Sequence, residues 1–151
     1  MKTGLHITGL SVKIGSETLV DNVALDIGPG EICGIAGESG SGKSMTALSI
    51  MGLLPMGAER SGTAQFDDIA LFAQNEQQMC ALRGRRISMV FQEPMTALNP
   101  VRTIGDQVAE PLIGHGVASA AEAREIAAEK LNRVGLPASQ FSLRHFPHEL
   151  S

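Results

Sequence analysis

Apolar and polar residues alternate along two stretches near the N-terminus, residues 5–14 and 18–27. A glycine-containing turn, residues 15–17, separates the two stretches. Alternation with a period of two is typical of a strand with one buried face, and two such runs around a short turn predict a hairpin. A second short strand pair, residues 63–66 and 69–71, is expected to join it. The sequence therefore predicts an antiparallel β element.

Two other runs, residues 32–36 and 87–91, are apolar without polar alternation. Such runs are typical of strands that are buried on both faces of a mainly parallel sheet. We therefore expect two core strands, with Cys33 as an inert buried thiol in the first. Residues 45–54 are apolar enough for a buried helix that ends at Pro55.

Further helices are expected after these runs. Residues 74–82 fit a short helix, and two pairs of residues beyond position 100 have the spacing of a capping box in front of helical segments. These pairs are Thr103 with Asp106 and Ser119 with Glu122. Pro111 lies inside the first of the two segments and predicts a kink there. Residues 92–100 contain two prolines and an asparagine, which exclude a continuous helix.

Composition and charge narrow the function classes. The 151 residues correspond to about one domain, and the net charge of −4 gives no broad electrostatic footprint for nucleic acid. Two cysteines make neither a disulfide framework nor a metal-ligand spacing. The N-terminus lacks the layout of a signal peptide, and no apolar run approaches the ~20 residues that span a bilayer. We therefore expect a cytoplasmic chain that reaches a membrane only through a partner.

The most specific chemical signal is residues 37–44, Gly-Glu-Ser-Gly-Ser-Gly-Lys-Ser, which match the phosphate-loop pattern G-x-x-x-x-G-K-[ST] at every fixed position. Glycines let successive backbone N–H groups turn inward on an anion at a helix N-terminus. Lys43 would bring a charge to the β- and γ-phosphates, and the Ser44 hydroxyl would coordinate Mg²⁺. The alternative is a plain glycine-rich turn, which seldom matches every position by chance. The expected ATP-binding residues here are Gly37, Ser39, Gly40, Ser41, Gly42, Lys43, Ser44 and Met45.

Three blocks in order resemble the ATP-binding subunits of ABC transporters. They are residues 37–44, residues 90–94 (Val-Phe-Gln-Glu-Pro) and residues 146–151 (Phe-Pro-His-Glu-Leu-Ser). Residues 93–100 most closely resemble the importers of dipeptides, oligopeptides and nickel. The resemblance implies an α/β fold: a P-loop NTPase core of mainly parallel strands, with an antiparallel β lobe and a partial helical lobe, and with the C-terminal part of the domain missing.

The same resemblance assigns parts of the chain. Residues 1–100 would form the ATP-binding core with the antiparallel lobe, the phosphate loop and the Q-loop, and residues 101–151 would begin the helical subdomain. It implies ATP and Mg²⁺ as cofactors and a second ATP-binding subunit as partner in a homo- or heterodimer. Integral membrane permease subunits would bind through residues 93–100, although an ordinary surface loop explains that block almost as well. The chain would lie on the inner face of the cell membrane, without nucleic acid.

Individual roles carry over to three more residues. Gln92 matches the Q-loop glutamine, which in the family touches Mg²⁺ and the attacking water, so Lys43 and Gln92 are the expected catalytic residues. Ser151 matches the serine of the LSGGQ signature and would contact ATP in trans across the dimer. Ile14 falls where the family stacks an aromatic ring on adenine. An aliphatic side chain there loses a stacking contribution of about 0.5–1.5 kcal/mol, which predicts weaker binding of the base.

The family's later motifs do not occur in these 151 residues. These motifs are the rest of the signature, the Walker B Asp with its following Glu, and the switch His. Because phosphoryl transfer depends on positioning water and metal together, we expect this chain alone to be inactive, whereas the full-length protein would be an ATPase. Two alternatives to a transport ATPase remain open: a truncated nucleotide-binding or interaction module without turnover and, less favoured, a soluble ABC-type ATPase of DNA maintenance.

Overall fold

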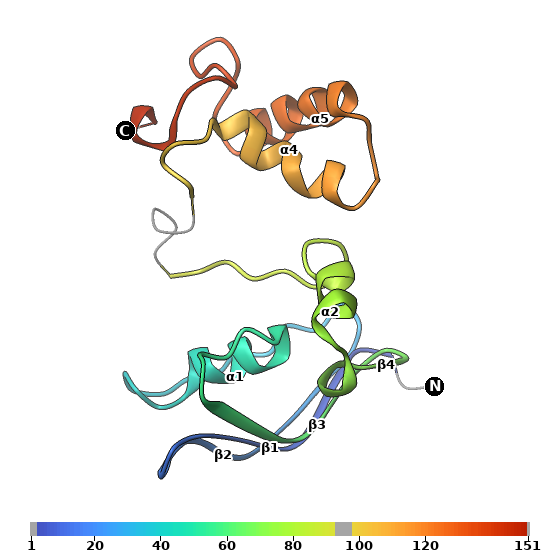
Figure 1. The fold of residues 1–151 in the computed structure, drawn as a ribbon, viewed down its shortest axis with the longest axis vertical. Helices are drawn as coiled ribbons and strands as arrows, with labels where there is room; N and C mark the ends of the chain where they lie inside the picture. The colour runs from blue at the N-terminus through green and yellow to red at the C-terminus, as the bar shows by residue number, and fades with distance from the viewer. Residues whose placement is uncertain (1–2, 93–97, 151) are drawn as a thin grey trace. The chain divides into compact units, whose positions relative to one another are not determined.

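The computed structural model describes residues 3–92 and 98–150. It divides into two compact units, residues 1–89 and residues 90–151, which we call the N-terminal unit and the C-terminal unit (Figure 1). The expected loop at residues 93–97 and the signature Ser151 lie outside the described residues. The assignment of residues 1–100 and 101–151 to an ATP-binding core and a helical subdomain stays a prediction.

The N-terminal unit is built on an antiparallel sheet of four strands in the order β2-β1-β3-β4. The strands are β1 Leu5–Ile14, β2 Glu17–Ile27, β3 Ala58–Phe66 and β4 Ile69–Ala70. β1 pairs with β2 from Leu5 opposite Ile27 to Ile14 opposite Glu17, and Gly15 turns the chain with φ +57°. Both predicted strand pairs are therefore confirmed, and β3 begins earlier than expected.

Two helices and a 3₁₀ turn lie on one side of this sheet (Figure 1). They are α1 Lys43–Met51, η1 Leu71–Ala73 and α2 Glu76–Leu82. The alternating apolar residues of the strands form the core with one residue each from η1 and α2, and Met45 and Ile50 of α1 pack against it. The fully or nearly buried members are Ile7, Leu10, Val12, Val20, Ala64, Leu71 and Met79.

Helix α1 ends earlier than predicted and buries polar residues. Gly52 stops it in the left-handed conformation with φ +65°, three residues before Pro55. The buried side chains of α1 include Thr46 and Ser49, whose hydroxyls donate to the carbonyls of Gly42 (3.0 Å) and Met45 (2.7 Å) one turn earlier. These bonds satisfy the hydroxyls, so a helix that is only partly apolar still packs on the sheet.

The two predicted core strands are wrong for this structure. Neither residues 32–36 nor residues 87–91 form a strand, and their only bridge among the described residues joins Arg83 to Ile87. Ile32 is 96% exposed and Val90 93% exposed, and Cys33 is exposed as well. A doubly buried parallel strand requires hydrogen-bonded neighbours at both edges, and no described strand pairs with residues 32–36. The apolar composition of residues 32–36 and 87–91 is therefore not sufficient to make these segments form strands.

The C-terminal unit contains α4 Ile104–Gly114, α5 Ala120–Arg133 and the 3₁₀ turn η2 Pro147–Glu149. The Thr103 and Ser119 side chains cap α4 and α5 as the sequence predicts, and the second cap is a complete capping box with Glu122. The two helices pack through alanines, Ala109 of α4 against Ala123 and Ala127 of α5. Pro111 lies within α4, and the helix continues past it. None of the described helices combines the length and the apolar composition of a membrane-spanning segment.

Candidate phosphate-binding site

The segment before α1 ends in a helix N-terminus that no side chain caps. Gly42 is the N-cap residue, with φ +85°, and Gly40 has φ +83°. The first hydrogen bond of the helix runs from the Thr46 N–H to the Gly42 carbonyl at 2.8 Å. The N–H groups of Lys43, Ser44 and Met45 therefore precede the helical ladder, and no acidic residue lies in the first turn. An uncapped N-terminus with free donors and a positive dipole end favours an anion.

The end of the loop lies against strand β2. A Cβ atom at position 42 would come within 2.6 Å of the Leu19 carbonyl oxygen and 3.1 Å of the Val20 Cγ2. Only glycine therefore fits there, both for space and for its left-handed backbone. At position 37 an added Cβ would lie 2.6 Å from the Ser41 Oγ, so the two ends of the loop also approach closely. The backbone contact and left-handed conformation at position 42 require the glycine that the sequence pattern has there, whereas the contact at position 37 is with a side chain that can rotate away.

Lys43 places its ammonium group inside the loop. Its Nζ donates to the carbonyls of Gly37 at 2.7 Å and Glu38 at 2.6 Å, and to the Ser41 Oγ at 3.2 Å. An ammonium has three N–H donors, so these bonds use all of them. A phosphate would therefore take the place of at least one of these acceptors, and a charge-assisted bond to phosphate is stronger than one to a neutral carbonyl.

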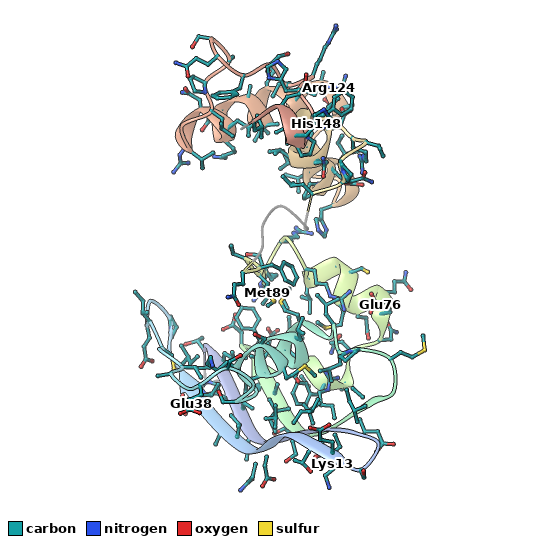
Figure 2. The ribbon with its side chains drawn as sticks, turned by 90° about the vertical axis from the view of Figure 1, so that its left-hand side faces the viewer. Lys13, Glu38, Glu76, Met89, Arg124 and His148 are labelled. Atoms are coloured by element: carbon teal, nitrogen blue, oxygen red, sulfur yellow. The ribbon has the colours of Figure 1, made fainter. Side chains whose placement is uncertain are left out.

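The arrangement fits a nucleoside phosphate with a divalent cation. Ser44 is exposed in the first turn of α1, beside the free N–H groups, so its hydroxyl is available to an oxygen-coordinated metal. Ser39 and Ser41 are exposed in the loop as well. Glu38, on the same loop (Figure 2), is its only acidic residue. Among the described residues, no group of three His, Cys, Asp or Glu side chains could hold a metal by itself. A metal here would need oxygens from the phosphates.

The other predicted site residues lie in different parts of the chain. Ile14 ends β1 in the same unit as the loop and is half-buried. Its side chain shares a face of β1 with Val12, a core residue, because alternate residues of a strand point to the same side. Gln92 is exposed and belongs to the C-terminal unit. The structure therefore brings together residues 37–45 and places Ile14 in their unit.

One residue that supports the end of α1 was not predicted from the sequence. The Arg83 guanidinium donates from Nε to the Met51 carbonyl at 2.8 Å and from Nη2 to the Gly52 carbonyl at 3.1 Å. It also pairs with Glu76 at 2.6 Å, and the hydrogen bond from Arg83 lowers the pKa of the Glu76 carboxyl. A cation at a helix C-terminus complements the helix dipole. No local pattern reveals this contact, because residues 83 and 51 lie far apart in the sequence.

Comparison with known proteins decides the family. A family model described as "ABC transporter" matches residues 20–151. The chain belongs to the ABC transporter family. This confirms the resemblance that the three sequence blocks carry.

Curated relatives of this ABC-family chain are transport ATP-binding proteins by name. The chain is 46% identical over 134 residues to the oligopeptide transport ATP-binding protein AppD of Bacillus subtilis, covering 87% of this chain and 41% of AppD. It is 40% identical over 137 residues to the oligopeptide transport ATP-binding protein OppD of Salmonella typhimurium, covering 91% of this chain and 41% of OppD. The peptidoglycan transport ATP-binding protein YejF of Agrobacterium fabrum is 46% identical over 153 residues, 97% of this chain and 28% of YejF. The chain thus spans about two fifths or less of these relatives.

A solved structure of the family has the same fold. The dimeric structure of the ATP-binding cassette MJ0796, in a post-hydrolysis state bound to ADP and Pi, matches with a TM-score of 0.78 and 28% sequence identity. The match covers 97% of this chain and 63% of that one. It confirms the expected α/β fold class of an ABC ATPase, although residues 32–36 and 87–91 form no strands in this chain.

Proposed function

We propose that this chain is part of the ATP-binding subunit that energises an ABC importer of peptides or nickel, by ATP binding and hydrolysis at a dimer interface. The observation that carries the proposal is the uncapped N-terminus of α1, with the Lys43 ammonium held inside residues 37–41 by three hydrogen bonds. Family membership supports it. The relatives described above favour peptides, since two of them are oligopeptide transport proteins by name.

Each site residue has a proposed role. The free N–H groups of the first turn of α1 and the Lys43 ammonium hold the β- and γ-phosphates of ATP, and the glycines at 40 and 42 shape the loop around them. Ser44 holds Mg²⁺, which when bound supplies positive charge to the phosphate oxygens. Ile14 packs against the adenine, and Gln92 reaches the metal and the attacking water. Ser151 contacts the nucleotide of a second subunit.

The proposed partners follow from the same function. A second ATP-binding subunit completes the nucleotide site, and integral membrane permease subunits bind through residues 93–100. The chain is then cytoplasmic and peripheral on the inner face of the cell membrane. Measurable co-purification with integral membrane subunits supports this assignment. Retained ATP binding without such partners contradicts the transport role and favours a nucleotide-binding module without turnover.

The nucleotide site is tested by a titration that does not depend on turnover. Lys43→Ala removes the ammonium of the loop, and Lys130→Ala removes an exposed ammonium on α5 that lies 3.4 Å from the Glu129 carboxylate. A hydrogen bond to a charged group contributes about 1.5–3 kcal/mol, so Lys43→Ala should weaken binding of Mg-ATP by about tenfold or more. Lys130→Ala should leave it unchanged. Equal affinities of the two variants would overturn the proposed site.

A further inference from the structure

Backbone carbonyls of residues 143 and 145, distant in the sequence, cap the N–H groups of the first turn of α4. The Ile104 N–H donates to the His145 carbonyl at 2.8 Å, and the Gly105 N–H donates to the Leu143 carbonyl at 2.9 Å. The next N–H, that of Asp106, donates to the Thr103 Oγ1 at 3.2 Å. These bonds satisfy the donors that a helix N-terminus leaves without internal partners. Residues 143–145 are therefore a structural part of the α4 N-terminus.

The close approach of residue 143 requires a glycine at position 105. A Cβ atom there would lie 2.7 Å from the Leu143 Cβ, 2.8 Å from its carbonyl oxygen and 3.2 Å from its Cα. Two of these three are backbone atoms, so the neighbouring segment itself would have to move. Gly105 is also buried within a helix, where glycine is disfavoured relative to alanine by about 1 kcal/mol. The contact with residue 143 explains why a glycine stands in the first turn of this helix.

The same turn of α4 holds a second segment through Gln107. The Gln107 Oε1 accepts from the Asn99 N–H at 2.7 Å. Its Nε2 donates to the carbonyls of Asn99 at 2.9 Å and Arg102 at 3.0 Å. The side-chain amide thus fixes the backbone on both sides of residues 100 and 101. One helical turn therefore binds both residues 99–102 and residues 143–145.

The residues after 145 continue in an ordered turn. The Phe146 N–H donates to the Glu149 Oε2 at 2.7 Å, and the Glu149 N–H donates to the Phe146 carbonyl at 3.0 Å. Residues 146–150 are thus held relative to residue 145, and the next residue in the sequence is Ser151. Figure 2 labels His148 in this turn and Arg124 on α5, in the same unit. The position of residues 146–150 therefore depends on the bonds of residues 143 and 145 to α4.

We propose that Gly105 is a positioning residue: its lack of a side chain lets the first turn of α4 hold residues 143–145, and with them the turn at residues 146–150, on the same helical turn that holds residues 99–102 through Gln107. The consequence for partner binding rests on the proposed function, in which residues 93–100 bind the permease and Ser151 contacts the second subunit. The first turn of α4 then bonds both to residues 99–102, at the end of the first contact segment, and to residues 143–145, which precede the turn before Ser151. Gly105 touches neither nucleotide nor partner and acts through the segment it positions.

Two glycines of the same helix make a matched test. Gly105→Ala and Gly114→Ala both replace a helical glycine, but an added Cβ at position 114 meets no atom within 4 Å. Alanine should favour the helix at both positions, and at position 105 alone the added Cβ meets Leu143, whereas Gly114 is exposed at the end of α4. We expect Gly105→Ala in the intact protein to speed hydrogen exchange of the amides at 104 and 105 by about fivefold or more, the equivalent of one hydrogen bond. Gly114→Ala should not.

The functional readouts separate this inference from the proposed function. ATP affinity, measured by titration, should be the same in both variants, because the phosphate loop lies in the other unit. ATP-dependent self-association, measured by sedimentation, should weaken several-fold for Gly105→Ala alone. Equal exchange rates and equal self-association of the two variants would overturn the inference. Failure of the unchanged protein to bind ATP would instead overturn the proposed function, and the exchange comparison would still decide the role of Gly105.

A second pair of variants covers the case in which Gly105→Ala does not fold. Ile104 is the first residue of α4, where proline is well tolerated, and Thr103 has the extended backbone (ψ 153°) that precedes proline readily. Ile104→Pro deletes the backbone N–H that donates to the His145 carbonyl. Ile104→Val shortens the side chain but keeps this N–H. We expect faster exchange of the amides at 145, 146 and 148–150 and weaker self-association for Ile104→Pro only. The same result for both variants would contradict the inference.

Discussion

The contact between the phosphate loop and strand β2 makes a sharp prediction for Gly42→Ala. The substitution forces a residue with a Cβ into the left-handed conformation, φ +85°, at a cost of about 1–2 kcal/mol. The new Cβ would also lie 2.6 Å from the Leu19 carbonyl oxygen, which is backbone and does not rotate away. Forcing atoms into a packed region typically costs about 1–3 kcal/mol more. We therefore expect the free energy of unfolding to fall by about 2–5 kcal/mol.

Gly40→Ala is the control within the same loop. Position 40 has nearly the same backbone conformation, φ +83°, but an added Cβ there meets no atom within 4 Å. It should therefore show only the conformational cost, about 1–2 kcal/mol. The assay is urea unfolding followed by the amide signals of β1 and β2, which report on the N-terminal unit alone. A loss for Gly42→Ala no larger than that for Gly40→Ala would refute the packing of the loop on β2.

Three further predictions concern a helix cap, an ion pair and the base contact. Ser119→Ala should destabilise the C-terminal unit by about 1 kcal/mol in urea unfolding, because the hydroxyl accepts from the Glu122 N–H, and an unchanged midpoint would contradict the cap. The hydrogen bond from Arg83 lowers the pKa of Glu76 in the folded protein. The ion pair therefore stabilises the fold fully above the pKa of glutamate in the unfolded chain, about 4.3, and this stabilisation is lost as the pH falls through the lower pKa of the folded state. Glu76→Gln should therefore reduce the fall in the free energy of unfolding over that acidic range. An unaltered pH profile of unfolding would show that the Arg83–Glu76 pair does not cause this fall. Ile14→Tyr should tighten ATP binding by about two- to tenfold through stacking on adenine, and an unchanged affinity in a titration would remove Ile14 from the site.

The sequence predicted the elements whose signal is local. The β1–β2 hairpin follows from alternation over residues 5–27 and from a turn with a left-handed Gly15. The starts of α4 and α5 follow from the Thr103 and Ser119 side chains, which bond to N–H groups three residues later. In both cases the residues that determine the structure are neighbours in the chain, so the pattern alone is sufficient.

The errors occur where structure depends on distant partners. Residues 32–36 have the composition of a buried strand, but burial is a property of the whole sheet, and no described strand pairs with them. The end of α1 depends on Gly52, which the apolar pattern through residue 54 concealed. Cys33 is exposed because it belongs to this unpaired run.

The candidate site was predictable in its residue types and less so in its contacts. The pattern over residues 37–44 correctly located a glycine-rich loop and a helix N-terminus without a side-chain cap. It did not show that Lys43 bonds to two carbonyls of its own loop, or that position 42 touches β2. The contact of position 105 with residue 143 was also hidden, since its partner lies 38 residues away. Such contacts depend on the folded chain, which a local pattern does not describe.

The most direct test of the central claim is an NMR titration of the labelled protein with Mg-ATP, following each backbone amide. The proposed site predicts the largest shift changes at residues 40–45, because these N–H groups precede the first helical hydrogen bond of α1 and would donate to the phosphates. Lys43→Ala should reduce these changes at the same nucleotide concentration. Saturable shift changes confined to other residues, or none at residues 40–45, would contradict the assignment of this loop as the phosphate-binding site.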